Sequence, residues 1–176
     1  MENIKNKIRT IPDFPKKGIM FRDVTTLFQD KEGLKLVADA LTDRYRNANI
    51  DVVAGIEARG FVLAGIIARE LGTGCVLIRK EGKLPYETKS ITYDLEYGTD
   101  TLEIHVDAIK NNQNVLVIDD LVATGGTALA AANLITNAGG TIKEMAFIID
   151  LPKMGGRKKL ADSGFNTFSL VEFDGE

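Results

Sequence analysis

The chain has 176 residues, of which 44% are hydrophobic and 27% charged, the composition of an ordinary soluble globular protein. Lys and Arg number 22 against 25 Asp and Glu, and this net charge of −3 disfavours nucleic acid as the main partner. With one Cys and one His, an internal disulfide and a cysteine zinc cluster are excluded, and a multi-histidine metal site is disfavoured.

The N-terminal residues predict neither a secretory signal nor a membrane span. Residues 1–7 are polar and lead into no apolar run, and no stretch approaches the roughly 18 consecutive apolar residues of a spanning helix. We therefore expect a cytoplasmic protein with no membrane partner, folded as a single domain over residues 1–176. Cys75, between Gly74 and Val76 in an apolar run, is expected to be a small buried hydrophobe.

Apolar periodicity alternates along the chain between helical and strand-like segments. In chain order, the predicted elements are a helix over 34–45, a strand over 51–54, a helix over 61–71 ended by Gly72, strands over 75–78 and 114–118, a helix over 127–138, a strand over 142–149, a short basic helix over 156–161 and a strand over 168–173. This alternation indicates an α/β fold with a mostly parallel central sheet flanked by helices.

Residues 80–98 interrupt the pattern. A connection of about twenty residues is longer than most in compact domains, so we expect this segment to be functional or mobile. Within and after it, Ser90–Tyr93 and Thr101–Ile104 have the composition of two strands that pair as a hairpin. The alternative is an ordinary charged surface loop, which would also account for its cations and its length.

The strongest chemical signal lies at residues 115–127. An apolar strand leads into Asp119 and Asp120, and a Thr-Gly-Gly-Thr turn then opens a helix, whose free amides predict a phosphate site. The carboxylates cannot bind that phosphate, so they need sugar hydroxyls or a phosphate-held Mg²⁺ as partners. A phosphorylated ribose satisfies both halves of the motif. The alternative is that Asp119 and Asp120 merely cap the helix.

A second strand-to-helix junction, Ile56–Gly60, is a further candidate anion site. Its cation is Arg59, for which the pattern alone favours a solvated residue at a helix start. The sequence contains neither a G-x-x-x-x-G-K-[ST] motif nor a G-x-G-x-x-G motif after a strand, so the two common nucleotide fingerprints are excluded. No Ser lies in a G-x-S-x-G elbow.

Residues 118–127 resemble the signature of the type I phosphoribosyltransferases, enzymes that use 5-phosphoribosyl-1-pyrophosphate (PRPP). Residues 13–23, 79–85 and 93–98 are similar to segments of the adenine-specific branch of that family. The resemblance runs in order from about Ile8 to Leu170, essentially the whole chain. It implies the type I phosphoribosyltransferase fold, with a mobile hood over residues 80–98.

The resemblance also implies an activity and its partners. The expected reaction transfers phosphoribose from PRPP to N9 of adenine and gives AMP and pyrophosphate. Mg²⁺ would be the cofactor, held mainly through PRPP and near Asp119 and Asp120. A homodimer is the implied assembly.

Residue roles follow from the same resemblance. The residues implied for the ribose and 5′-phosphate are Asp119, Asp120, Ala123, Thr124, Gly125, Gly126 and Thr127. Those implied for pyrophosphate are Glu57, Ala58, Arg59, Arg79, Lys80 and Lys83. Those implied for adenine are Met20, Phe21, Arg22 and Leu151, with Met20 and Leu151 on either side of the ring. Arg59 and Glu96 are the implied catalytic residues, Glu96 as the proton-transfer group.

Some alternatives stay open at this point. Glu81 departs from the family pattern, where a neutral or basic residue is usual, and its charge would weaken the attraction of pyrophosphate. Glu96 could be a solvated carboxylate at a strand edge. Lys153 keeps 6-oxopurines such as hypoxanthine or xanthine open as substrates, because related enzymes place a Lys against the oxo group. A non-catalytic PRPP-sensing regulator is disfavoured, because residues 1–14 leave no room for a DNA-binding domain.

Overall fold

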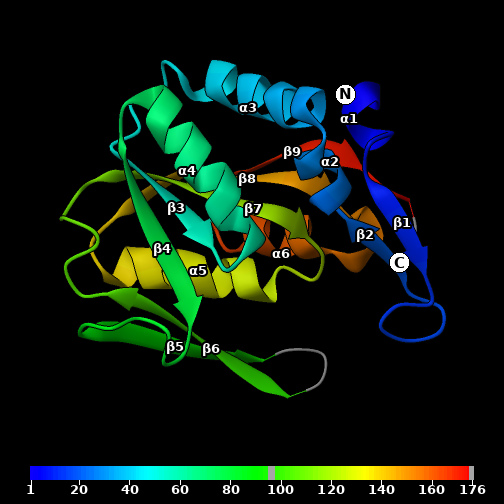
Figure 1. Cartoon of the computed structure of the whole chain (residues 1–176). Coiled ribbons are helices and arrows are strands. Elements are labelled where there is room, and N and C mark those ends of the chain that lie inside the picture. Colours follow the sequence, from blue (N-terminus) through cyan, green and yellow to red (C-terminus); the bar gives the residue numbers. More distant parts are fainter. Residues whose placement is uncertain (95–97, 175–176) are drawn as a thin grey trace.

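A seven-stranded sheet runs through the middle of the molecule (Figure 1), in the strand order β5-β6-β4-β3-β7-β8-β9. The computed structural model describes residues 1–94 and 98–174. In chain order the elements are α1 (Glu2–Lys5), β1 (Arg9–Pro12), β2 (Met20–Asp23), α2 (Thr25–Gln29), α3 (Lys31–Tyr45), β3 (Val52–Ile56), α4 (Arg59–Leu71), β4 (Gly74–Lys80), β5 (Thr88–Asp94), β6 (Thr99–His105), β7 (Asn114–Val122), α5 (Gly126–Asn137), β8 (Thr141–Asp150), the 3₁₀ turn η1 (Pro152–Met154), α6 (Gly156–Asp162) and β9 (Thr167–Glu172).

The fold class expected from the sequence is confirmed. Strands β4, β3, β7, β8 and β9 are parallel neighbours, and at one edge of the sheet β6 is antiparallel to both β4 and β5. Each element predicted from apolar periodicity has a counterpart in the structure, with boundaries that differ by a few residues. Gly72 ends α4 in the left-handed conformation, at φ 70°. This is the stop signal that the sequence carries at that position.

Helices cover both faces of the sheet, and this explains the continuous apolar run of β7. Leu116 and Ile118 point into one core with α1 to α4, whereas Val115 and Val117 point into the other core with α5 and α6. All four side chains are fully buried. A strand that is buried on both faces carries apolar residues at successive positions and does not alternate apolar with polar residues, as the run Val115–Ile118 shows.

The N-terminal region forms a separate antiparallel pair, β1 with β2, which periodicity did not predict. Its strands pair Ile11 with Phe21 and lie beside the main sheet (Figure 1). Arg9 and Asp23 join the two strands by a salt bridge of 2.6 Å. The pair brings Met20 and its neighbours toward the carboxyl ends of the central strands.

The predicted hairpin is confirmed and is longer than expected. Ser90 pairs with Glu103, and the ladder extends from Thr88 to Asp94 on one strand. Strand β4 reaches Lys80 and β5 begins at Thr88. In the described part of residues 80–98, only residues 81–87 and Gly98 therefore lie outside a strand. The hairpin packs against α5, where the ammonium group of Lys89 donates to the carbonyl of Asn137 at 3.1 Å. The mobility expected of residues 80–98 stays a prediction.

The expectation that Cys75 is buried was wrong. Cys75 is exposed, and Leu77 on the same side of β4 is 42% exposed. Val76 and Ile78 alternate with them and face the core, so the strand buries only one of its two faces at this point. Among the helices of the described ranges, none has the length and apolar character required to cross a membrane.

Candidate active site

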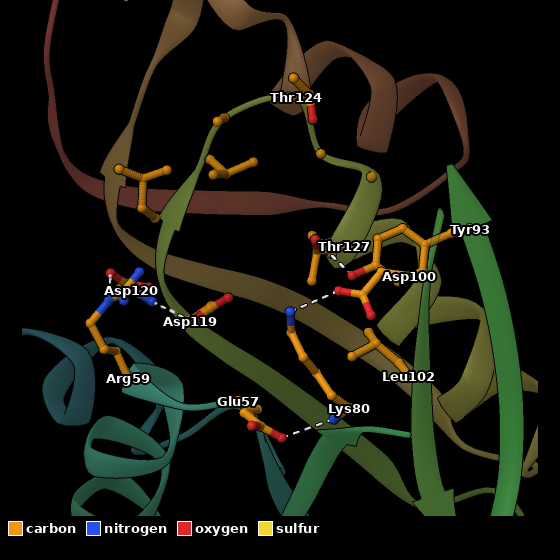
Figure 2. A pocket seen from close by; sticks show the side chains of 16 residues that line it. Glu57, Arg59, Lys80, Tyr93, Asp100, Leu102, Asp119, Asp120, Thr124 and Thr127 are labelled. Carbon is orange, nitrogen blue, oxygen red and sulfur yellow. Dashed lines mark hydrogen bonds and ion pairs between the residues drawn. The ribbon is translucent and has the colours of Figure 1, made fainter. Parts of the chain in front are cut away.

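The order in which the chain adds strands to the sheet reverses between β3 and β7. The candidate site lies at this topological switch point. The chain continues from β3 to β4 on one side, whereas β7 joins the other side of β3. Ligands in open α/β sheets bind at the carboxyl ends of such strands. There, a cavity of about 310 Å³ is lined by Glu57, Arg59, Lys80, Tyr93, Asp100, Leu102 and residues 119–128 (Figure 2).

Gly60 allows the start of α4 to lie against the end of β7. A Cβ atom at Gly60 would sit 2.7 Å from the carbonyl oxygen of Ile118 and 3.0 Å from Oδ1 of Asp119. Only a residue without a side chain permits this approach. The contact places Arg59, the first residue of α4, beside the two carboxylates of β7.

Arg59 forms an ion pair with Asp120. Its Nε donates to Oδ2 of Asp120 at 2.5 Å, and the Asp120 side chain is 6% exposed. Burial alone would lower the pKa of Arg59, but the Asp120 carboxylate outweighs it and the pKa lies above its usual value. Arg59 is therefore neither a purely solvated residue nor a free cation.

Asp119 has a different environment. Its Oδ1 accepts from the backbone N–H of Asp120 at 2.8 Å. Burial, followed by repulsion from Asp120, raises the pKa of Asp119 well above its ordinary value. Two adjacent carboxylates thus differ, one held by a guanidinium and the other destabilised in its charged form.

The turn after β7 opens α5 without a side-chain cap. Gly125 occupies the N-cap position in the left-handed conformation, at φ 78°, and among residues 1–94 and 98–174 no side chain caps the first turn. The backbone amides of that turn are therefore available to an anion. The alternative that Asp119 and Asp120 cap the helix is wrong, because Gly125 is the N-cap residue.

Glu57 contacts three of the residues that the family resemblance implies for pyrophosphate binding. Its carboxylate accepts from Arg79 Nε at 3.3 Å, from the backbone N–H of Lys80 at 2.9 Å and from the ammonium group of Lys83. Burial would raise the pKa of Glu57, but these donors together hold it below its ordinary value. Arg79 and Lys83 do not line the cavity themselves, but they contact Glu57, which does. Ala58, the remaining residue expected to bind pyrophosphate, is the N-cap residue of α4.

The hairpin contributes residues to the cavity that periodicity and motif could not find. The Lys80 ammonium pairs with Asp100 on β6 at 2.9 Å, and the Tyr93 hydroxyl on β5 lies 3.2 Å from that of Thr127 (Figure 2). Both contacts depend on the antiparallel pairing of β6 with β4 and β5. No local motif marks Asp100, and Tyr93 lies in the segment 93–98 that resembles the family but had no role assigned to it. Glu96, the expected proton-transfer residue, lies outside the described residues.

A second and larger cavity, of about 770 Å³, adjoins the first. It is lined by Lys16, Lys17, Ile19, Met20, Phe21, Arg22, Arg59, Leu121, Ala123, Leu151 and Met154. Three residues, Arg59, Leu121 and Ala123, line both cavities. All four residues expected to bind the base therefore lie together, next to the phosphate turn. Of the additional residues, Lys16, Lys17 and Ile19 lie in the segment 13–23 that resembles the family but had no role assigned to them, and Met154 carried no sequence signal.

The side chains of Phe21 and Arg22 are held from outside the cavity. The Phe21 ring meets that of Phe14 edge to face at 5.2 Å between centroids. The Arg22 guanidinium lies 4.4 Å from the centre of the Phe173 ring and donates to the Thr10 hydroxyl. Lys153 is exposed and is not among the residues that line the cavity.

Comparisons with known proteins agree with this site. Residues 23–173 match the family model "Phosphoribosyl transferase domain". A curated adenine phosphoribosyltransferase of Chlorobium phaeovibrioides is 57% identical over 175 residues, which is 98% of this chain and 99% of that protein.

Solved structures show the same likeness in three dimensions. The crystal structure of adenine phosphoribosyltransferase from Thermoanaerobacter pseudethanolicus superimposes with a TM-score of 0.93 at 46% identity, covering 98% of this chain and 99% of that one. The Giardia lamblia enzyme complexed with 9-deazaadenine gives 0.93 at 37% identity, covering 98% and 97%. The chain therefore belongs to the phosphoribosyl transferase domain family and, within it, to the adenine phosphoribosyltransferases.

Proposed function

We propose that the protein transfers the phosphoribosyl group of PRPP to N9 of adenine, releasing pyrophosphate and forming AMP. The observation that carries this proposal is the pair of contiguous cavities that share Arg59, Leu121 and Ala123. One holds an uncapped helix start beside two carboxylates, and the other is a mainly apolar space of a size that admits a flat base. The family membership and the 9-deazaadenine bound by the Giardia lamblia relative support adenine as the base.

The phosphate and ribose of PRPP match the end of β7. The first-turn amides of α5, with the hydroxyls of Thr124 and Thr127, would bind the 5′-phosphate. Asp119 and Asp120 would accept hydrogen bonds from the ribose hydroxyls, which are neutral donors suited to carboxylates. The contribution of these groups to the rate is mainly positioning of the reacting carbon.

The pyrophosphate of PRPP would lie between Arg59, Lys80 and the cations held by Glu57. Three of these cations have a carboxylate partner within the chain: Asp120 for Arg59, Asp100 for Lys80 and Glu57 for Lys83. An incoming diphosphate would compete with these carboxylates for the cations. Glu57 itself would repel the anion, so its role in pyrophosphate binding would be to hold Arg79 and Lys83 in place.

Mg²⁺ fits this site as a partner of PRPP. Among the described residues, no three His, Cys, Asp or Glu side chains converge on one point that could hold a metal ion. Mg²⁺ is bound by oxygen ligands and commonly by one or two carboxylates together with substrate phosphates. Asp119 and Asp120 are the carboxylates that would be nearest to a PRPP-bound ion. When bound, Mg²⁺ would neutralise charge on the departing diphosphate.

In the chemical step the bond between C1 of the ribose and the pyrophosphate oxygen breaks, and N9 of adenine bonds to C1. Positive charge builds on the ribose and negative charge on the leaving group, so Arg59 and Lys80 would stabilise the departing pyrophosphate. The N9 proton leaves the base, and Glu96 remains our proposed acceptor. Closure of the hood over residues 80–98 would exclude water from the reacting carbon.

Two alternatives are separated by one experiment. Purified protein is mixed with Mg²⁺, PRPP and one purine at a time, and nucleotide formation is followed by anion-exchange chromatography. AMP formed from adenine supports the proposal. A nucleotide formed from hypoxanthine or xanthine in its place would reassign the base, and PRPP binding without any nucleotide would indicate a PRPP-sensing regulator.

Two wider features belong to the same proposal. We expect a homodimer, which agrees with the exposed apolar side chains of Val62 and Leu77, 44% and 42% accessible. We also propose a location in the cytoplasm, where the exposed thiol of Cys75 would stay reduced.

A further inference from the structure

The turn that would receive the 5′-phosphate is supported from behind by α6. We name residues 123–127 the phosphate loop. The backbone N–H of Gly156, the first residue of α6, donates to the carbonyl of Ala123 at 2.9 Å. Just before it, the backbone N–H of Leu151 donates to the carbonyl of Val122 at 3.1 Å. The end of β7 and the phosphate loop are thus hydrogen-bonded to residues 151–156.

The contact between Gly156 and the phosphate loop is backbone against backbone. A Cβ atom at Gly156 would lie 2.3 Å from the Ala123 carbonyl oxygen, 2.7 Å from the Gly125 nitrogen and 2.9 Å from a methyl carbon of Val122. Conversely, a Cβ atom at Gly125 would lie 2.9 Å from the Gly156 Cα. Two glycines therefore face each other, and neither position has room for a methyl group.

Helix α6 is anchored and cannot easily withdraw. Leu160 is fully buried in the core beneath the sheet. The Arg157 guanidinium lies 3.3 Å from the carboxylate of Glu172 and 3.9 Å from that of Asp150, which tie it to the ends of β9 and β8. A side chain added at Gly156 would consequently displace the phosphate loop more readily than α6.

The same segment also forms a wall of the base cavity. Leu151 and Met154 line that cavity, and Gly156 follows Met154 by two residues. Residues 151–156 therefore contact the base cavity with their side chains and the phosphate loop with their backbone. The spacing between the two binding regions depends on this segment.

We infer that Gly156 is a positioning residue, whose missing side chain lets α6 hold the phosphate loop where the first turn of α5 receives the 5′-phosphate of PRPP. The inference rests on the proposed function. It concerns phosphate binding: of the residues that line the base cavity, a displaced phosphate loop would move only Ala123, whereas Leu151 and Met154 would keep their places. Its effect is therefore specific to ligands that carry the 5′-phosphate.

Gly156→Ala tests this inference against the matched control Gly65→Ala. Gly65 lies within α4, and a Cβ atom there would meet no other group within 4 Å. We expect Gly156→Ala to weaken the binding of ribose 5-phosphate, measured by calorimetry, and to raise the KM for PRPP, each at least tenfold. The KM for adenine should change less than threefold, and Gly65→Ala should match the unmodified protein throughout.

A second variant covers the case in which Gly156→Ala does not fold. Arg157→Gln removes the ion pair between Arg157 and Glu172, which links α6 to β9. The Arg157 side chain is half-exposed, so the variant should fold. It should weaken ribose 5-phosphate binding about twofold to fivefold without a matching change in the KM for adenine.

The outcomes separate the inference from the proposed function. If the unmodified protein binds ribose 5-phosphate and turns over PRPP while Gly156→Ala, or in its absence Arg157→Gln, behaves in the same way, the positioning role is wrong. Equal losses for PRPP and adenine would also overturn it, since they indicate a general structural role. If the unmodified protein neither binds ribose 5-phosphate nor uses PRPP, the proposed function itself fails.

Discussion

The Nε atom of Arg59 donates to the Oδ2 atom of Asp120 at 2.5 Å, and this ion pair joins the start of α4 to the end of β7. In the proposed reaction the start of α4 would bind pyrophosphate and the end of β7 would bind the ribose. The two residues of the pair would therefore bind the groups on either side of the bond that breaks, between C1 of the ribose and the pyrophosphate oxygen. PRPP would draw Arg59 toward its diphosphate and leave Asp120 free to accept from a ribose hydroxyl.

Neutral substitutions of the two carboxylates should impair catalysis alike and stability differently. We expect Asp119→Asn and Asp120→Asn each to lower kcat/KM for PRPP at least tenfold, about 1.4 kcal/mol of transition-state stabilisation. Asp120→Asn should also lower the free energy of unfolding by about 1 kcal/mol, because half-exposed Arg59 loses its partner. Asp119→Asn should leave it unchanged or raise it. Steady-state kinetics and chemical denaturation test this, and wild-type rates in both variants would refute the ribose assignment.

The raised pKa of Asp119 predicts a specific pH dependence of stability. In the unfolded chain Asp119 loses its proton near its ordinary pKa of 3.8, whereas the folded chain retains the proton to higher pH. The folded state then binds more protons, so this group's contribution to stability falls as pH rises from about 4 through the raised pKa.

The comparison of wild type with Asp119→Asn isolates that contribution from the other titrating groups. The free energy of unfolding of the variant, relative to wild type, should increase with pH above about 4 and level off once Asp119 is ionised in the folded state. Urea denaturation at a series of pH values measures it. A constant difference over the whole range would show that the two states share one pKa.

The central strands and helices could be predicted because their signals are local. The apolar run Val115–Ile118 and the stop at Gly72 need no knowledge of the rest of the chain. The phosphate loop is also local, since strand, carboxylates, glycines and helix follow one another directly. The sequence therefore predicted these parts of the fold and grouped the phosphate and ribose residues that the structure brings together.

The remainder depends on contacts between distant segments. That Glu57 holds Lys83 follows from the register of β3 against β4, and that Asp100 pairs with Lys80 follows from the register of β6 against β4. No short motif records either register. The exposure of Cys75 likewise depends on what covers β4. The role assigned to Glu96 stays a prediction, since it came from the family resemblance alone.

Limited digestion with trypsin tests the expected mobility of the hood. In the free protein we expect cleavage after Lys83, in the stretch without regular pairing, to be faster than cleavage after Lys89. Lys89 pairs with Ile104 in the hairpin and donates to Asn137, and such backbone resists proteolysis. PRPP with Mg²⁺ should slow cleavage after Lys83. If PRPP binds and the cleavage rate is unchanged, the segment is an ordinary surface loop.

Sedimentation equilibrium tests the proposed homodimer. At micromolar concentration the protein should sediment at twice the chain mass, and Leu77→Lys should weaken the association by placing a charge on an exposed apolar site. Cys75→Ser, an uncharged substitution at another exposed position of β4, is the control and should leave the association unchanged. A monomer at these concentrations would remove the claim.

The most direct test of the central claim is a comparison of adenine with hypoxanthine under saturating PRPP and Mg²⁺, with AMP or IMP and pyrophosphate measured together. We expect one pyrophosphate per AMP and a kcat/KM for adenine more than about a hundredfold above that for hypoxanthine, because an amino-to-oxo change leaves buried backbone groups unpaired at about 1–3 kcal/mol each. Comparable kcat/KM values for the two bases, or pyrophosphate release without AMP, would contradict the account.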